Sequence, residues 1–221
     1  MGFEEMNAWQ FIKAGGPIMF PIILCSWFAL GIIMEKLYYF RTINTNTLKL
    51  RSQVFNYIKE NRIKEAIGLC DINRSPVAKI LKSGIIKFGA SKEEIKESME
   101  DASLYEIPKL EKHLGALTTI AHISPLLGLL GTVIGIAGSF HTIQVRAASL
   151  NPITPSDLAG GIWEALITTV AGLVVAIPVY LTYNYFISHI NNCVLEMERA
   201  ATELVNLLSH ISEIKNTPTS D

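Results

Sequence analysis

One carboxylate stands out as a residue that could do chemistry, because it lies inside a long apolar stretch. Glu164 is the only acidic residue at membrane depth, about ten residues beyond the expected start of its helix, or about 15 Å along the helix axis. An acid in such a position usually faces a bundle interior or a water-filled cavity. Glu164 is therefore either a proton-carrying group or a structural carboxylate held by hydrogen bonds between helices, and the sequence leaves both open.

Threonines in the same apolar stretches form the second candidate group. Thr132 and Thr169 carry hydroxyls that both donate and accept, so each can bond a backbone carbonyl or line a wet path. Carbonyl bonding is the commoner role for an isolated threonine in a membrane helix. Both roles stay open here.

Small residues recur at intervals of three and four beside these polar groups, which places most of them on one side of a helix. Small side chains let helix backbones approach closely in lipid. The stretches lack the Gly-Lys-Ser/Thr ending of a phosphate-binding loop, so a packing role is predicted. The packing residues are Gly128, Gly131, Gly135, Gly161, Gly172 and Pro178.

The elements that must position these residues are three uncharged stretches. Residues 14–34, 113–145 and 165–195 contain no Asp, Glu, Lys or Arg over 21, 33 and 31 positions, respectively. A membrane-spanning helix needs about 20 predominantly apolar residues. The sequence therefore predicts an all-α membrane protein with three transmembrane helices, and long helices extending from them into the cytoplasm.

Basic residues near the ends of the stretches predict the orientation. Seven lie on one side and two, Lys13 and Arg146, on the other. Basic residues mark the cytoplasmic side. The predicted segments are an outer N-terminal segment 1–16, a first span 17–39, a cytoplasmic helical region 40–118, a second span 119–146, an outer loop 147–155, a third span 156–188 and a cytoplasmic C-terminal helix and tail 189–221.

Local signals predict where helices begin. Ser91 and Glu94 form a capping box, and from there an apolar stripe predicts one long helix over about 92–146, bent but not ended at its prolines. Thr154 can cap the third helix, with Asp157 favourable in its first turn. That helix should continue inward past residue 189, and the end beyond Asn216 should be disordered.

Composition excludes several function classes. A net charge of −1 gives no basic face for nucleic acid. The three cysteines are too few and too dispersed for a disulfide framework, and they show no zinc-binding spacing. Neither a Ser/His/Asp set nor paired carboxylates can be assembled. We therefore expect no enzyme activity, no metal and no cofactor.

Two long motifs carry a family likeness. The segments 126–136 (LLGLLGTVIGI) and 161–178 (GIWEALITTVAGLVVAIP) resemble the MotA/TolQ/ExbB proton channel family, and within it most resemble ExbB. Gly16-Pro17 and Glu35-Lys36-Leu37-Tyr38 are similar to the first span of that family. The resemblance covers the whole chain.

The resemblance implies a pentameric ring in the bacterial inner membrane, with the N-terminus periplasmic and the C-terminus cytoplasmic. An ExbD-like single-span partner would supply the aspartate that binds and releases protons. Proton flow would then energise outer-membrane transport through a TonB-like transducer. By motif match, Thr132 and Thr169 fall on the pore-lining threonines of the family, and Glu164 falls on the glutamate of its third span.

Two other functions remain open from the sequence. A TolQ-like or other motor of the same family would differ only in its cargo. A passive membrane scaffold would use Glu164 and the threonines merely to lock helices together.

Overall fold

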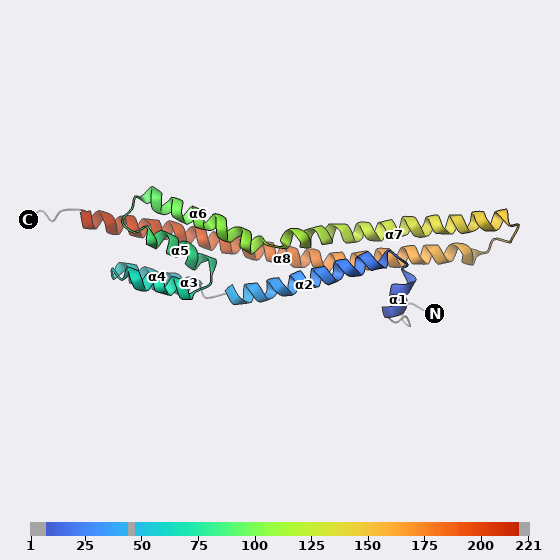
Figure 1. Ribbon diagram of the computed structural model, residues 1–221, viewed down its shortest axis with the longest axis horizontal. Coiled ribbons are helices and arrows are strands. Elements are labelled where there is room, and N and C mark those ends of the chain that lie inside the picture. Colours follow the sequence, from blue (N-terminus) through green and yellow to red (C-terminus); the bar gives the residue numbers. More distant parts are fainter. Residues whose placement is uncertain (1–7, 44–46, 217–221) are drawn as a thin grey trace, which may run out of the picture. The chain divides into compact units, whose positions relative to one another are not determined.

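The computed structural model describes residues 8–43 and 47–216, and these residues form helices joined by short turns (Figure 1). No strand occurs in the described ranges, which confirms the all-α prediction. The helices are α1 (Ala8–Ala14), α2 (Met19–Ile43), α3 (Thr47–Lys59), α4 (Ile63–Ile72), α5 (Pro76–Ile86), α6 (Lys92–Glu111), α7 (Leu114–Ala148) and α8 (Pro155–Asn216).

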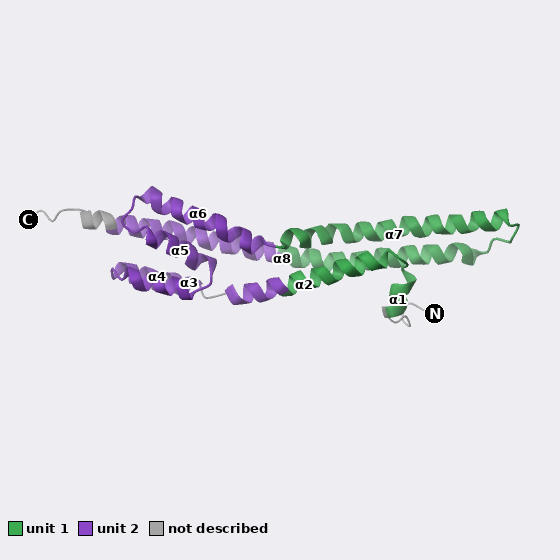
Figure 2. Ribbon diagram, in the orientation of Figure 1, with its two compact units in different colours: residues 1–34, 113–184 green, residues 35–112, 185–221 purple. Residues whose placement is uncertain are grey.

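The chain divides into two compact units, coloured separately in Figure 2. Unit 1 comprises residues 1–34 and 113–184, and unit 2 comprises residues 35–112 and 185–221. The long helices α2 and α8 each contribute to both units. The predicted cytoplasmic region 40–118 corresponds closely to the part of unit 2 that precedes α7.

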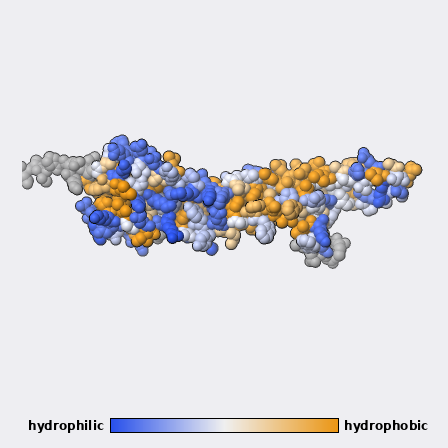
Figure 3. All heavy atoms as spheres, viewed as in Figure 1, coloured by the Kyte–Doolittle hydropathy of each residue, from blue (hydrophilic) through white to orange (hydrophobic). Residues whose placement is uncertain are grey.

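Unit 1 carries the apolar surface expected of membrane-spanning helices. Three helical stretches, beginning at Met19, Lys92 and Pro155, are long and apolar enough to cross a membrane, as predicted. In the most apolar 18-residue window of each stretch, only 17, 28 and 39% of the window, respectively, is buried. Large side chains such as Trp27 (79% exposed) point outward. The surface over these windows is largely apolar in Figure 3. Such a surface requires lipid or other chains around it.

The prediction of one continuous helix over 92–146 is wrong. The chain forms α6 and α7, separated at Lys112 and His113, where Lys112 has ψ 135° and His113 lies in the left-handed region with φ 66°. Pro108 and Pro125 remain inside α6 and α7, respectively, so neither proline causes the interruption.

The start of α8 lies where the sequence predicts it, at Pro155 after Thr154. The capping bonds converge on Asp157, whose carboxylate accepts from the Thr154 amide at 2.9 Å and from the Thr154 hydroxyl at 2.7 Å. Arg146, in the last turn of α7, forms an ion pair with the same carboxylate at 2.9 Å. This cluster links the end of α7 to the start of α8.

Two further features concern the ends of the chain. The helix α8 continues to Asn216, which confirms that the third helix extends well past residue 189. The predicted disordered end beyond Asn216 lies outside the described residues, as do residues 1–7 of the predicted outer segment 1–16. The short helix α1 was not predicted.

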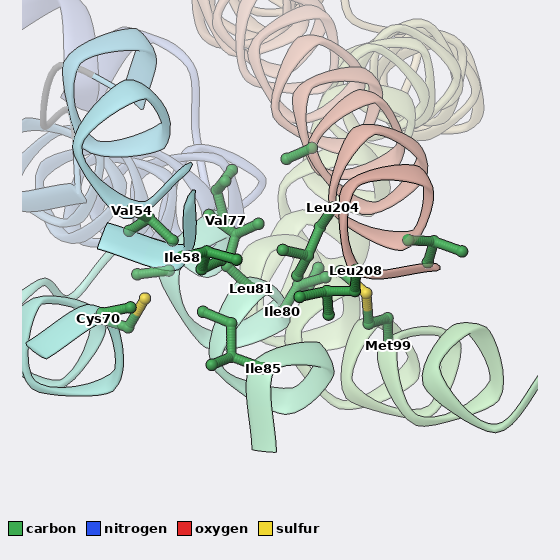
Figure 4. Packing of buried hydrophobic residues seen from close by; sticks show 14 of the residues in the cluster. Val54, Ile58, Cys70, Val77, Ile80, Leu81, Ile85, Met99, Leu204 and Leu208 are labelled. Atoms are coloured by element: carbon green, nitrogen blue, oxygen red, sulfur yellow. The ribbon is translucent and has the colours of Figure 1, made fainter. Parts of the chain in front are cut away.

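Unit 2 is built around its own apolar core. Leu50, Val54 and Ile58 recur at four-residue intervals on α3, and Leu204 and Leu208 do so on α8. Figure 4 shows Val54 and Ile58 beside residues of α5, and Met99 of α6 beside Leu208. The N-caps of α5 and α6 are serines, including the predicted Ser91, whose hydroxyl accepts from the Glu94 amide at 3.2 Å. The prediction that this region is helical is confirmed.

Candidate functional site

The glycines of α7 lie directly against α8 within unit 1. A side chain at Gly128 would place its first carbon 3.0 Å from the Thr168 carbonyl oxygen, and one at Gly135 would place it 2.6 Å from the Gly161 carbonyl oxygen. Any larger residue would therefore push the two backbones apart. The same close approach involves Gly131 against Thr168, Gly161 against Gly135 and Ser139, and Gly172 against Ser124. Pro178 lies further along α8 and is exposed.

Two adjacent threonines of α8 are placed along this interface. Thr169 is half-buried, and its hydroxyl donates across the interface to the Gly128 carbonyl at 3.3 Å. Thr168 is 1% exposed, and its hydroxyl donates to carbonyls of its own helix, to Ala165 at 2.8 Å and Glu164 at 3.2 Å. Thr169 thus donates across the interface, whereas Thr168 fills the contact with Gly131.

Thr132 lies on the flank of the packed face of α7 rather than at its centre. It is half-buried, and its hydroxyl donates to the Leu129 carbonyl of its own helix at 2.6 Å. The neighbouring Gly131 is the residue in contact with α8. Thr132 and Thr169 are therefore each partly open to a surface of unit 1, and each holds a backbone carbonyl.

Glu164 is half-buried and directed at the turn between α1 and α2. Its Oε1 packs so closely on Gly16 that a side chain there would collide with the carboxylate. Gly16 also has φ 61°, a conformation that side chains disfavour, so glycine is needed there for two reasons. At 100° per residue, Glu164 and Thr169 lie about 140° apart, on opposite flanks of the face that α8 presents to α7.

Ser139 and Thr168 are two further polar members of the interface. Ser139 is 3% exposed, and its hydroxyl donates to the Leu158 carbonyl at the start of α8 at 3.3 Å. Both residues fall on the three- and four-residue spacing of the glycines. That spacing was the available signal, because a hydroxyl on a glycine stripe must face the partner helix.

Unit 2 holds a buried charge cluster that the sequence did not predict. Glu106 of α6 accepts from Lys79 of α5 at 2.7 Å and from Lys109 at 2.5 Å, and its side chain is only 7% exposed. Burial alone would raise the pKa of Glu106, but the hydrogen bonds from Lys109 and Lys79 outweigh burial and lower this pKa. The cluster ties α5 to α6 and gives Glu106 a structural rather than a proton-carrying character.

Metal and thiol chemistry find little support in the described residues. Across 8–43 and 47–216, no group of three or more His, Cys, Asp or Glu residues is arranged to hold a metal ion. Cys25, Cys70 and Cys193 are unpaired. Burial raises the pKa of the Cys70 thiol to about 11, so this thiol stays protonated at neutral pH.

The chemical capacity of the site in unit 1 therefore rests on hydroxyls and one carboxylate. A threonine hydroxyl has one donor and two acceptor lone pairs, so a hydroxyl that donates to a carbonyl still accepts from water or from a partner. A carboxylate accepts hydrogen bonds when it is ionised and donates one when it is protonated. These groups suit proton transfer and helix locking equally.

The profile of the MotA/TolQ/ExbB proton channel family matches residues 72–199. This range includes α5, α6, α7 and most of α8. It therefore contains Thr132, Thr169 and Glu164 together with the helix break at His113.

Individual proteins are similar over most of the chain. An ExbB-like biopolymer transport protein of Synechocystis is 34% identical over 173 residues, which is 78% of this chain and 81% of that protein. An ExbB homologue of Methanothermobacter thermautotrophicus is 31% identical over 191 residues, which is 86% of this chain and 66% of that protein. The Tol-Pal system protein TolQ of Pseudomonas aeruginosa is 42% identical over 94 residues, which is 42% of this chain and 39% of that protein.

Proposed function

The chain belongs to the MotA/TolQ/ExbB proton channel family, and from this premise we propose that it is the ExbB-like subunit of a motor driven by the proton-motive force. In this proposal five copies form a ring in the bacterial inner membrane. An ExbD-like single-span partner sits in the ring, and proton flow energises a TonB-like transducer of outer-membrane transport. The N-terminus and the 147–155 loop face the periplasm, and unit 2 faces the cytoplasm.

The observation that carries the proposal is the family match over the α7–α8 hairpin, together with the exposed apolar surface of unit 1. Three helices are too few to enclose a pore, so an isolated subunit cannot form one. The most apolar part of each of its three candidate spans is also largely exposed. Neighbouring copies and lipid would cover these windows. Assembly is thus part of the proposal rather than an addition to it.

Thr132 and Thr169 are proposed to line the proton path. The bond from the Thr169 hydroxyl to the Gly128 carbonyl is 3.3 Å, beyond the usual 2.5–3.0 Å of such bonds. Little free energy therefore opposes rotation of this hydroxyl toward a water or toward the partner. The shorter bond of Thr132, at 2.6 Å, makes that hydroxyl the more fixed of the two.

The partner's aspartate is proposed to complete the path. A proton moving down the membrane potential releases about 2.3 kcal/mol per 100 mV, and this energy drives the motion of the partner relative to the ring. Glu164 lies on the opposite flank of α8, against Gly16. We propose that it sets the position of the α1–α2 turn on α8 and so acts outside the threonine-lined path.

A second function from the same family is a TolQ-like motor. It is favoured by the 42% identity to TolQ over 94 residues. A passive scaffold is the remaining alternative, and the bond between Thr169 and Gly128 is the contact that such a scaffold would use.

Co-purification with a mass measurement tests the proposal. The tagged chain is expressed with the product of any adjacent gene that encodes a single-span protein with one intramembrane aspartate, and the detergent complex is analysed by native mass spectrometry. We expect five copies of this chain with bound partner. A stable monomer with no higher species contradicts the motor, and a pentamer that never binds such a partner favours the scaffold.

A further inference from the structure

Lys36 of α2 is buried in unit 2, although it is a cation near the end of a predicted span. Its side chain is 2% exposed, and its ammonium donates to the Leu110 carbonyl at 2.7 Å. The ammonium also lies 5.3 Å from the centre of the Tyr39 ring and 5.9 Å from that of Phe40. A buried cation needs such partners because desolvation is costly.

The carbonyl that Lys36 binds belongs to the last turn of α6. The final carbonyls of a helix lack partners within the helix, and a cation is favoured there by the helix dipole. In a continuous helix the Leu110 carbonyl would accept from the Leu114 amide. The extended backbone of Lys112 and the left-handed His113 take that amide out of register. The ammonium of Lys36 thus occupies the place of the Leu114 amide.

The two residues of this contact lie close in the chain to the ends of the unit 2 segment 35–112. The chain enters unit 2 at Glu35 and leaves it after Lys112. Lys36 is one residue past the first boundary, and Leu110 is two residues before the second. The contact between Lys36 and Leu110 thus lies within unit 2, near both ends of its segment 35–112.

We propose that Lys36 is a positioning residue that keeps α6 and α7 from joining into one continuous helix. The motor needs this break to couple proton flow to transport. The inference rests on the proposed function for its second half only. Two arrangements compete for the Leu110 carbonyl: the broken one, bound by Lys36, and a continuous helix, bound by the Leu114 amide. Removing the ammonium leaves a buried carbonyl unsatisfied and favours the continuous helix.

Amide hydrogen exchange of residues 114–116 tests the first half directly. These are the first amides of α7, and the first bond of that helix runs from the Leu117 amide to the His113 carbonyl at 3.2 Å. In a merged helix all three amides gain carbonyl partners. We expect Lys36→Met to slow their exchange by about tenfold or more, while Lys36→Arg, which keeps a donor, stays near the wild type.

A matched pair at His113 tests the same equilibrium with Lys36 intact. Glycine tolerates the left-handed conformation and disfavours a helix interior, whereas alanine does the reverse, and both lack the imidazole. His113→Ala should therefore slow exchange at 114–116 as Lys36→Met does, and His113→Gly should not. The double variant of Lys36→Met with His113→Gly should restore the wild-type exchange. Unchanged exchange in both Lys36→Met and His113→Ala overturns the inference.

Energy-dependent uptake in cells with normal complex levels tests the second half. We expect Lys36→Met and His113→Ala to lose uptake, and the double variant with His113→Gly to recover it. Slowed exchange with normal uptake shows that transport does not need the break, which overturns the second half of the proposal. Lost uptake that His113→Gly does not rescue also overturns it. If the wild type itself shows no uptake, the proposed function fails, while the exchange measurements still decide whether Lys36 holds the break.

Discussion

The contact between Gly135 and Gly161 gives the most quantitative prediction for unit 1. A side-chain carbon at Gly135 would lie 2.6 Å from the Gly161 carbonyl oxygen and 3.2 Å from the Ala165 side chain. Reaching an ordinary contact of 3.4 Å requires α7 and α8 to separate by about 0.8 Å at this point. The obstacle is backbone, so no side-chain rotation relieves it.

Gly135→Ala is therefore expected to destabilise the protein. Overpacking of this kind costs about 1–3 kcal/mol, and the better helix propensity of alanine returns at most about 1 kcal/mol. The matched control is Gly138→Ala, three residues along the same helix, where a side-chain carbon would meet no atom within 4 Å. The control should gain up to about 1 kcal/mol. The two variants should thus differ by about 2 kcal/mol in the free energy of unfolding.

Unfolding of the purified protein in mixed micelles, followed by tryptophan fluorescence, measures this difference. Because the comparison is between two Gly→Ala changes in one helix, effects of detergent and of the unfolded chain largely cancel. Equal stability of Gly135→Ala and Gly138→Ala would refute the close α7–α8 packing.

Three further outcomes are expected. Glu106→Gln should destabilise the protein by about 1–2 kcal/mol at pH 7, because it weakens two hydrogen bonds to a charged group whose lysine partners are themselves about half exposed. The lysine partners lower the pKa of Glu106, so this contribution is present above the ordinary pKa of a glutamate and fades as the pH falls through the lowered pKa. Chemical denaturation at pH 7 and pH 3 should show the difference shrinking. In a cysteine-free background, reporter cysteines at the exposed Glu97 and Ser149 should be labelled from opposite sides of the membrane, and labelling from one side contradicts the orientation. Glu164→Gln should lower energised uptake but not abolish it, since glutamine keeps the shape that packs on Gly16; complete loss would mean that Glu164 must titrate.

The sequence predicts an interface between α7 and α8 from a single periodicity. Glycines at intervals of three and four must share a helix face, and only another backbone lies close enough to require them. The start of α8 is equally local, since Thr154, Pro155 and Asp157 are near neighbours in the chain. Such features depend on few residues and short distances along the sequence.

The helix break could not be predicted because the contact that we propose to hold it is not local. Neither residue of the break, Lys112 or His113, is a proline or a glycine. Histidine is tolerated both in helices and in the left-handed region. That contact joins the Leu110 carbonyl to Lys36, which lies 74 residues before Leu110. The position of Glu164 is a similar case, because periodicity gives its direction on α8 but not the turn at Gly16 that it meets.

Removal of one hydroxyl is the sharpest test of whether this chain conducts protons to energise outer-membrane transport. Thr169→Val is nearly isosteric and loses only the bond to Gly128, so assembly should persist. Thr182→Val is the matched control, since its hydroxyl donates only to the Pro178 carbonyl of its own helix at 2.8 Å. The measurement is energy-dependent outer-membrane uptake in cells with normal levels of the complex. The account predicts that Thr169→Val abolishes uptake while Thr182→Val retains it, and wild-type uptake by Thr169→Val would contradict it.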